Sequence, residues 1–279
     1  MAIDCSVIIV THNSQKFMPN LMAALDKQTV PADRIILVDS GSNDISYLLP
    51  YRERSDVVLV FDQKDIGFCK GNNLGMQQVP ANSDYVLFLN PDAFLEEAFL
   101  EKAIAMMEDP ANSLVGILTG PLLGYDIQSD KPTGKYDSTG IFCTWYGRWF
   151  DRAQGTPIDE RLYNKIEEVP AICGALMFCR KKALDSILLR GKEVFDNTFY
   201  MYKEDIDLSL RIRRKGWKLL YAPQPAAYHC RGWNSNRKLM PRKFRLCSAR
   251  NELRIHARSL SPCALYSLAK YAAVKILDK

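Results

Sequence analysis

The sequence lacks any apolar run of the ~18 residues that a membrane-spanning helix needs. Its amino-terminal segment, "MAIDCSVIIVTHN", has no basic residues before its apolar run, so we expect a buried first strand and no signal peptide. The eight cysteines form no C-x-x-C pair and no metal-finger spacing. This usage argues against a disulfide framework and predicts reduced thiols in a cytosolic protein. Apolar residues make up 47% of the chain, which excludes a disordered protein.

Two common phosphate-binding motifs are also missing. No G-x-G-x-x-G follows the first apolar run, where "THNSQKF" stands instead, and no G-x-x-x-x-G-K-[ST] occurs anywhere. A dinucleotide-dependent oxidoreductase and a P-loop NTPase therefore lose most of their support. If the protein binds a nucleotide, other groups must neutralise the diphosphate.

Positive charge is concentrated at the end of the chain. Residues 231–279 hold twelve Lys or Arg and two Asp or Glu, a balance of +10, whereas the whole chain carries +5. Such a tail suggests an anionic partner, namely a nucleotide phosphate, lipid headgroups or nucleic acid, although a solvated surface would look the same. Nothing in the rest of the sequence supports nucleic acid, so we expect none.

The first 120 residues alternate between short apolar runs and segments with helical spacing, and one domain suits the length. This pattern predicts an α/β fold with a mostly parallel central sheet and helices on both faces. The expected strands are 5–10, 34–39, 57–61, 85–90 and 114–120, and the expected helices are 16–27, 43–54, 70–79 and 96–108.

The rhythm changes after residue 120. Residues 121–170 predict an irregular insertion or an acceptor-facing lobe, because Gly, Pro, Asp and aromatic residues interrupt them. A strand leading into a helix is expected over 171–184, and one further strand in "KLLYAPQPAAYHCRG".

Polar segments follow the predicted strands at 11–14, 39–44, 62–73 and 90–94. Ligands of parallel α/β sheets sit beyond the carboxyl ends of the strands, so we expect the functional site there. Asp39 can bind a base or ribose, or it can cap the turn that follows. The Gly-rich "GFCKGNN" can let the backbone approach a sugar or phosphate closely, or it can be a loop-to-helix junction.

"NPDAF" offers a candidate metal ligand. Asp92 follows a buried strand that ends at Asn90 and turns at Pro91. Mg²⁺ and Mn²⁺ prefer oxygen ligands, commonly one or two carboxylates plus substrate phosphates. The alternative is a simple turn, since all three residue types are common in turns.

Glu204 and Asp205 open "EDIDLSLRIRRKG", which predicts a helix ended by Gly216. Acids in a first turn complement the helix dipole, and that alone explains them equally well. However, an aromatic segment precedes them, and two neighbouring acids near apolar groups hold a proton more tightly. One of them is then a candidate general base. His229, after a later strand, is either a metal or phosphate ligand or a structural histidine.

Together these segments resemble glycosyltransferase family 2, the inverting sugar transferases of GT-A fold. The resemblance rests on "SVIIVTHN", "ILVDSGSND", "DIGFCKGNN", "LFLNPDAFL", "ICGALMFCRKKAL", "FDNTFYMYKEDIDLSLRIRRKGW" and "YAPQPAAYHCRG", and it covers about residues 3–235. "NPD" followed by F-x-x-Y-x-E-D-x-D-L-x-x-R is most similar to the rhamnosyltransferase-like branch. That branch uses dTDP-L-rhamnose to build O-antigen and cell-wall glycans of bacteria.

The resemblance implies a role for each matching residue. Asp205 is the expected general base, and Glu204 orients it or the acceptor. Asp92 and His229 are the expected ligands of Mg²⁺ or Mn²⁺. The residues expected to bind the nucleotide-sugar are Thr11, Asn13, Asp39, Ser40, Asp65, Gly67, Lys70, Asn73, Asn90 and Pro91. Two of these depart from the family pattern: Asn90 removes one charge from the Asp-x-Asp metal motif, and Asp65 stands where the branch often has Asn.

We expect a catalytic domain over 1–235 and a basic helical extension over 236–279. Leu265, Leu268, Ala272 and Ile276 form one stripe of a predicted helix, with Lys270 and Lys275 nearby. The stripe suits an anionic membrane surface at the cytoplasmic face, where a lipid-linked glycan acceptor would lie, or packing on the core or on another subunit.

Three other functions stay open at this point. A UDP-hexose donor is one, and a non-catalytic nucleotide- or glycan-binding subunit is the second. A nucleotidyltransferase is the third, but it would need a basic Gly-rich loop where "THNSQKF" stands.

Overall fold

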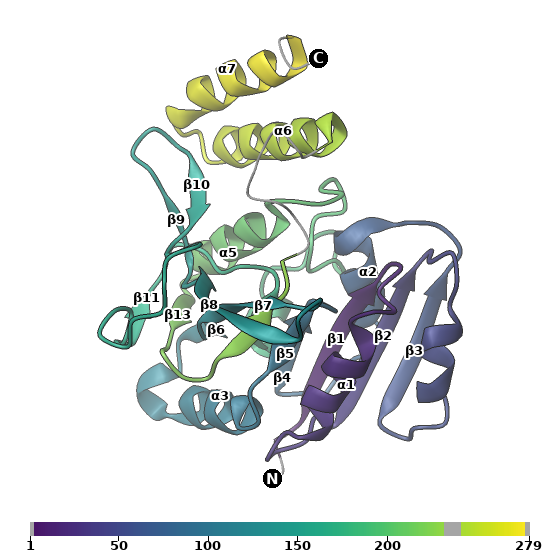
Figure 1. The fold of residues 1–279 in the computed structure, drawn as a ribbon. Helices are drawn as coiled ribbons and strands as arrows, with labels where there is room; N and C mark the ends of the chain where they lie inside the picture. The colour runs from purple at the N-terminus through teal and green to yellow at the C-terminus, as the bar shows by residue number, and fades with distance from the viewer. Residues whose placement is uncertain (1–2, 232–240, 277–279) are drawn as a thin grey trace.

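The computed structural model describes residues 3–231 and 241–276 (Figure 1). It confirms the predicted α/β fold. The core is an eight-stranded sheet with the order β11-β13-β6-β12-β4-β1-β2-β3. The strands that run parallel are β1 (Cys5–Thr11), β2 (Arg34–Ser40), β3 (Val57–Asp62), β4 (Tyr85–Leu89), β6 (Val115–Thr119) and β13 (Lys218–Tyr221). Two strands run against them, β11 (Glu167–Glu168) and β12 (Leu176–Arg180).

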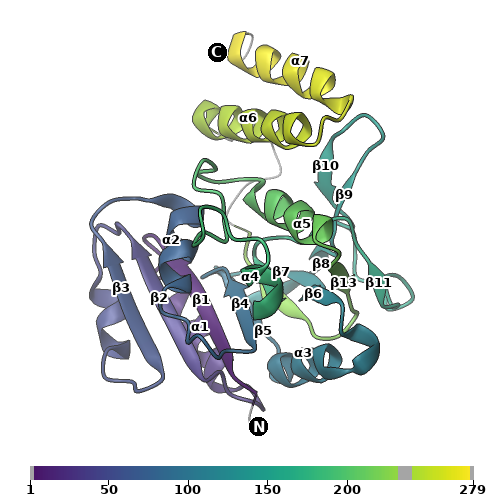
Figure 2. The same ribbon diagram turned by 180° about the vertical axis from the view of Figure 1, so that it is seen from behind.

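Helices cover both faces of this sheet and bury a separate apolar core on each. One face carries α1 (Met18–Asp26) and α3 (Phe99–Glu108). The other carries α2 (Gly67–Met76), α4 (Lys181–Asp185) and α5 (Glu204–Arg214), which Figure 2 shows from behind. The central strands are buried on both sides, which explains why they read as continuous apolar runs in the sequence.

The helix expected over 43–54 is wrong. The chain forms a short 3₁₀ turn there, η1 (Ser46–Tyr51), with Pro50 inside it. Proline has no N–H to donate and disfavours the α conformation of the residue before it, so a regular α-helix cannot continue through this position. A second 3₁₀ turn, η2 (Pro110–Asn112), follows α3.

Residues 121–170 are also more regular than predicted. β7 (Leu122–Asp126) and β8 (Lys131–Ser138) join β5 (Ala93–Leu95) and β14 (Ala227–His229) in a second sheet, of order β5-β14-β7-β8. The first five residues of β8 are exposed, so the apolar pattern that would reveal the strand is missing. "KLLYAPQPAAYHCRG" likewise contains two strands, β13 and β14, which belong to different sheets.

The carboxyl-terminal region is helical, as expected. It consists of α6 (Arg242–Arg258) and α7 (Cys263–Ile276), stacked on each other beyond α5 (Figures 1 and 2). A hairpin of β9 (Ile141–Cys143) and β10 (Trp149–Asp151) reaches from the core toward both helices. The expected domain boundary at 235 lies outside the described residues. In the part of the chain that is described, no helix combines the length and apolarity needed to cross a membrane.

Candidate active site

The ends of β1 and β2 are tied together by Asp39, whose side chain is buried. Its carboxylate accepts hydrogen bonds from the main-chain N–H of Ser42 at 2.9 Å and from the hydroxyls of Ser42 at 2.5 Å and Tyr47 at 3.3 Å. Thr11 Oγ1 donates a further one at 3.4 Å. Asn13 closes the same loop, because its Oδ1 accepts from the N–H of Asn43 at 2.9 Å. Asp39 therefore caps this turn, whatever else it binds.

Ser40 connects β2 to the start of α2. Its hydroxyl accepts from the N–H groups of Ile66 at 2.9 Å and Gly67 at 3.2 Å. Gly67 has φ +74°, and a Cβ there would lie 2.6 Å from the carbonyl oxygen of Tyr200. The Tyr200 hydroxyl in turn donates a hydrogen bond to Asp65. Glycine at 67 thus allows the start of α2 to lie against the segment that precedes α5.

The predicted donor residues Lys70 and Asn73 lie on α2 itself, so "GFCKGNN" forms the first turns of a helix. Lys70 is exposed. Asn73 is buried, and its amide accepts from the N–H groups of Val194 and Phe195 and donates to Phe195 O and Asn197 Oδ1. All four of its hydrogen-bonding positions are used within the protein. Asn73 therefore joins α2 to residues 194–197, and its side chain has no position left for a nucleotide-sugar.

Asn90, Pro91 and Asp92 form the predicted turn after β4. The N–H of Ala93 donates to Asn90 O at 3.1 Å, and Asp92 O accepts from the N–H of Cys230 at 2.9 Å. The second of these bonds places Asp92 beside β14. Asp92 Oδ1 lies 3.3 Å from Nε2 of His229, and both side chains are nearly buried.

Behind His229 the charges alternate in sign. His229 Nδ1 is 2.8 Å from Asp137 Oδ2, Asp137 Oδ1 is 2.6 Å from Arg231 Nε, and Arg231 also pairs with Asp151 at 2.6 Å. Burial alone would lower the pKa of His229, but the carboxylates of Asp92 and Asp137 outweigh it and raise the pKa to about 9. Burial likewise acts to lower the pKa of Arg231, and the charges of Asp151 and Asp137 overcome it.

At the start of α5, Glu204 and Asp205 form an acidic pair, in which Glu204 is buried and Asp205 is half-buried. Burial, reinforced by the charge of Asp205, raises the pKa of Glu204 to about 8. Burial also raises the pKa of Asp205, against the hydrogen bonds that its carboxylate accepts from Gly174 N at 3.0 Å and Ile206 N at 2.8 Å. Among the described residues, Glu204 Oε2 is buried with no hydrogen-bond partner. The hydrogen bonds from Gly174 and Ile206 favour the charged form of Asp205, so the proton that the pair retains lies on Glu204.

Gly174 and Ala175 connect the acidic pair to the turn after β4. Gly174 N–H binds the carboxylate of Asp205, while Ala175 O accepts from the N–H of Asn90 at 3.1 Å. A Cβ on Gly174 would lie 3.3 Å from Cβ of Asp205, so glycine allows this close approach. The structure therefore brings the candidate base and the candidate metal turn to one edge of the sheet.

The residues at that edge fit a divalent cation. Among the described residues no three His, Cys, Asp or Glu side chains form a complete metal cage. Asp92 and His229 offer one carboxylate and one imidazole nitrogen, which suits an ion whose remaining ligands are water and substrate phosphates. Asn90 lies in the same turn and leaves Asp92 as its only carboxylate.

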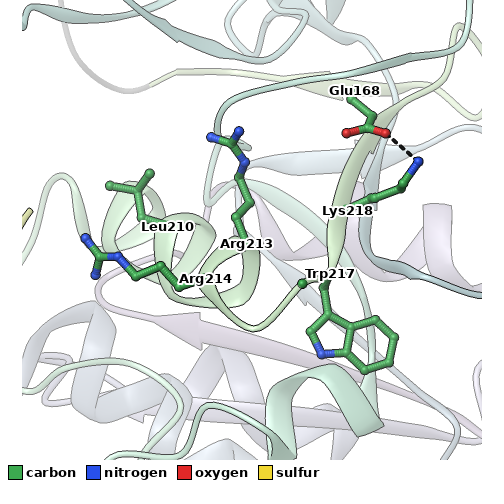
Figure 3. Close-up of a pocket in the computed structure, with 7 residues that line it drawn as sticks. Glu168, Leu210, Arg213, Arg214, Trp217 and Lys218 are labelled. Atoms are coloured by element: carbon green, nitrogen blue, oxygen red, sulfur yellow. Dashed lines mark ion pairs between the residues drawn. The ribbon is translucent and has the colours of Figure 1, made fainter.

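A separate hollow lies at the opposite end of α5. It measures about 420 Å³ and is lined by Glu168, Leu210, Arg213, Arg214, Gly216, Trp217 and Lys218 (Figure 3). Lys218 is paired with Glu168 at 2.7 Å. None of the predicted site residues lines this hollow, so it is distinct from the candidate active site.

Sequence reasoning missed the residues that support the site, chiefly Asp137, Arg231 and Gly174. Asp137 lies 92 positions from His229 in the chain, so no local pattern could reveal the contact. The one local signal was "HCRG", in which Arg231 follows His229 by two positions.

The comparisons with known proteins agree with this geometry. The O-antigen chain rhamnosyltransferase RfbN of Salmonella typhimurium is 28% identical over 106 residues, which is 38% of this chain and 33% of that protein. The rhamnosyltransferase WbbL of Escherichia coli is 25% identical over 246 residues, covering 86% of this chain and 88% of that protein. The chain thus spans about a third of the first relative and most of the second.

A solved structure of GalNAc-T7 with UDP, GalNAc and Mn²⁺ superposes with a TM-score of 0.67. It is 18% identical and covers 91% of this chain and 48% of that one, so it establishes a shared GT-A fold. The sequence model of glycosyl transferase family 2 matches residues 6–188. On this match, the chain belongs to glycosyl transferase family 2.

Proposed function

We propose that this glycosyltransferase is an inverting enzyme that moves L-rhamnose from dTDP-L-rhamnose to a glycan or lipid-linked glycan of the bacterial cell surface. The observation that carries the mechanism is the Glu204–Asp205 pair, joined through Gly174 and Ala175 to the turn that bears Asp92. The rhamnosyltransferase names of the two relatives favour this donor over others.

Transfer with inversion needs a base on one side of the anomeric carbon and a leaving group on the other. Asp205 takes the proton of the acceptor hydroxyl while the oxygen of that hydroxyl bonds to the anomeric carbon. The bond from that carbon to the diphosphate breaks at the same time, and its electron pair leaves on the phosphate oxygen. Such a base contributes about 10²–10⁴ in rate.

Two features of the pair suit Asp205 for this role. The N–H groups of Gly174 and Ile206 fix its carboxylate and favour its charged form. Glu204, with a pKa of about 8, holds a proton at neutral pH and so leaves Asp205 as the charged member of the pair.

At the opposite end, Asp92 and His229 would hold Mg²⁺ or Mn²⁺. When bound, the ion neutralises charge on the leaving diphosphate. The proposed nucleotide end of the donor site lies where β1 and β2 end and α2 begins. It consists of Thr11, Asn13, Asp39, Ser40, Asp65 and Gly67, and Lys70 on α2 is exposed.

The acceptor is proposed to lie at an anionic membrane surface bound by α7. Leu265, Leu268 and Ile276 are 76%, 52% and 69% exposed, so the predicted stripe does not pack on the core. Trp145, at the tip of the β9–β10 hairpin, is 91% exposed, and its carbonyl accepts from Sγ of Cys263 at the start of α7. An amphipathic helix beside an exposed tryptophan suits a lipid interface.

One predicted lipid contact of this stripe is wrong. Lys270 turns inward and pairs with the buried Glu252 at 2.5 Å, where its ammonium and that of Lys203 neutralise the Glu252 carboxylate. Lys275 is exposed near the same face of the helix and stays the candidate contact.

The first test of the function is release of nucleotide from a panel of dTDP-, UDP- and GDP-sugars, with Mn²⁺ or EDTA, by the wild type and Asp205→Asn. We expect turnover of dTDP-rhamnose alone, which needs metal and is lost in the variant. Turnover of a UDP-hexose would retain the mechanism and end the rhamnose assignment. Binding of a donor without any turnover would favour a non-catalytic subunit.

The membrane surface is tested by sedimentation with vesicles that contain anionic phospholipid. We expect the Leu265→Ser/Leu268→Ser variant to bind more weakly than the wild type. Leu162→Ser is the matched control, because Leu162 is equally apolar and 50% exposed but lies elsewhere. If the Leu265→Ser/Leu268→Ser variant kept its vesicle binding and lost self-association instead, the face would be a subunit interface.

A further inference from the structure

The chain immediately before the acidic pair is in a conformation that it cannot hold alone. Tyr202 and Lys203 have φ +67° and +69°, the left-handed region that residues with a side chain rarely adopt. Lys203 is also the N-cap of α5, and its own side chain makes no capping hydrogen bond. Contacts from elsewhere must therefore fix the position from which Glu204 and Asp205 project.

Helix α6 of the carboxyl-terminal extension supplies these contacts through Asn251. This side chain is fully buried, and its Nδ2 donates to the carbonyl oxygens of Met201 at 3.0 Å and Tyr202 at 2.9 Å. Both bonds end on the main chain just before the acidic pair, across about fifty positions of sequence.

The next residue, Glu252, holds the side chain of Lys203. Glu252 is fully buried and lies between Lys203 Nζ, at 3.2 Å, and Lys270 Nζ of α7, at 2.5 Å. Burial alone would raise the pKa of Glu252, but the two ammonium groups outweigh it and keep the pKa below its usual value. The Lys203 charge in turn favours the ionised forms of Glu204 and Asp205.

Two arginines on the same helix support this arrangement from the other side of the segment. Arg258 pairs with Asp196 at 2.6 Å and with Asp207 of α5 at 3.0 Å. Arg254 Nη1 donates to Thr198 O at 2.5 Å. Every turn of α6 from 247 onward therefore contacts the chain that leads into the acidic pair, or α5 itself.

We propose that Asn251 and Glu252 are positioning residues for the reaction: they fix the main chain and the lysine that precede the acidic pair. The extension is then part of the active site as well as a membrane-facing element. This inference rests on the proposed role of Asp205, and the experiment separates the two.

The test compares Asn251→Ala and Asn251→Asp with Asn112→Ala. Asn112 is the matched control, because its Nδ2 also donates to a main-chain carbonyl, that of Met106 at 2.9 Å, but far from the site. Three quantities are measured for each variant: nucleotide release per nucleotide-binding site, the Kd for the nucleoside diphosphate, and deuterium uptake of the peptides that contain Gly174 and residues 203–207.

In Asn251→Ala we expect kcat to fall about 10–100-fold, since small misplacements of a catalytic group cost this much. The Kd should stay within about twofold of the wild type, because the nucleotide-binding strand ends are untouched. Asn251→Asp should lose more, although it is isosteric, because a carboxylate faces two carbonyl oxygens without a donor to offer. Deuterium uptake should rise at Gly174 and residues 203–207 in both variants.

Three outcomes decide between the readings. If Asn251→Ala keeps its kcat and its protection at Gly174 while only its Tm falls, as in the control, the positioning role is overturned. If Asp205→Asn keeps its turnover in the same assay, the assignment of the base fails, and the uptake data still report whether α6 holds the segment. Equal uptake in Asn251→Ala and wild type overturns the inference even without a turnover assay.

The role of Glu252 is tested by Lys203→Met, which removes the cation and avoids leaving a buried glutamate wholly unpaired, since Lys270 stays. We expect the acidic limb of the kcat/KM pH profile to move to higher pH, because Lys203 lowers the pKa of both acids. A pH profile identical to that of the wild type contradicts this part of the proposal.

Discussion

The two ends of the candidate active site are built from opposite arrangements of charge. At the proposed metal end, acids and bases alternate from Asp92 through His229 and Asp137 to Arg231. At the other end, Glu204 and Asp205 are two neighbouring acids, the first buried and the second half-buried. Both His229 and Glu204 have a raised pKa, but for opposite reasons: neighbouring charges overcome burial at His229, whereas burial itself raises the pKa of Glu204. Alternating charge suits one end to its proposed role in cation binding, and desolvation suits the other to hold a proton.

The largest expected effect separates the two ends directly. Asp205→Asn should lower turnover by about 10²–10⁴ and leave the affinity for Mn²⁺ and nucleotide unchanged. Asp92→Asn should instead lower the affinity, by weakening the joint binding of Mn²⁺ and nucleoside diphosphate. Calorimetry of both variants beside initial rates checks this, with Asp185→Asn as the surface control. Loss of nucleotide affinity in Asp205→Asn would contradict the division.

A smaller effect is expected one step behind the metal end. Asp137 accepts the hydrogen bond of His229 Nδ1 and thereby leaves Nε2 facing Asp92. Loss of such a supporting partner typically costs about 10–100-fold in metal affinity. We expect this loss in Asp137→Asn when Mn²⁺ binding is followed by electron paramagnetic resonance with nucleoside diphosphate present.

The matched control for that measurement is Asp126→Asn, because Asp126 caps an exposed turn of β7 and does not contact His229. Equal Mn²⁺ affinity in Asp137→Asn and Asp126→Asn would show that His229 needs no support from Asp137.

The acidic pair should also set how stability depends on pH. The pKa of Glu204 is about 8 in the folded protein and about 4.5 in the unfolded chain, so the folded state binds its proton more tightly. The resulting stabilisation is complete below about pH 4.5 and is lost as the pH rises through about 8. Glu204→Gln should remove this component, so its urea midpoint should fall less than that of the wild type between pH 5 and about 9. An unchanged slope would mean that Glu204 is ionised throughout.

The smallest effect concerns the link between Asp65, just before α2, and the segment that precedes α5. Tyr200→Phe removes the hydrogen bond from the Tyr200 hydroxyl to Asp65. Burial and this carboxylate together raise the pKa of Tyr200 to about 12, so the hydroxyl keeps its proton for that bond. A hydrogen bond of this kind contributes about 1 kcal/mol, so we expect a change of about fivefold in the donor KM and little change in kcat. A large fall in kcat would instead make Tyr200 part of the base end.

The parts of this architecture that the sequence predicted are those with a local pattern. Asp39 and Asp92 follow buried apolar strands, and Glu204 and Asp205 open a helix with an apolar face, so each could be found from its neighbours. The apolar spacing predicts a helix over 43–54, but Pro50 lies inside this segment and a 3₁₀ turn forms at 46–51. β8 was missed because five of its residues face water.

The supporting contacts could not be predicted, since they join segments far apart in the chain. Asn73 belongs to a Gly-rich segment that predicts a nucleotide-sugar contact, yet its side-chain amide bonds to residues about 120 positions away. Asn251 and Glu252 read as two polar residues of a basic tail. Both are fully buried in the fold, and burial of this kind depends on tertiary structure that the local sequence does not show.

The dipeptide Gly174–Ala175 has a consequence for the evolution of specificity. Its N–H and C=O groups bond to Asp205 and to the turn at Asn90, so under the proposed roles one covalent unit sets the separation between acceptor activation and departure of the nucleotide. A change of sugar could not then be accommodated by stretching this unit without moving both ends at once. Selection for a new donor or acceptor would act instead on the residues around the two ends and would leave the reacting geometry intact.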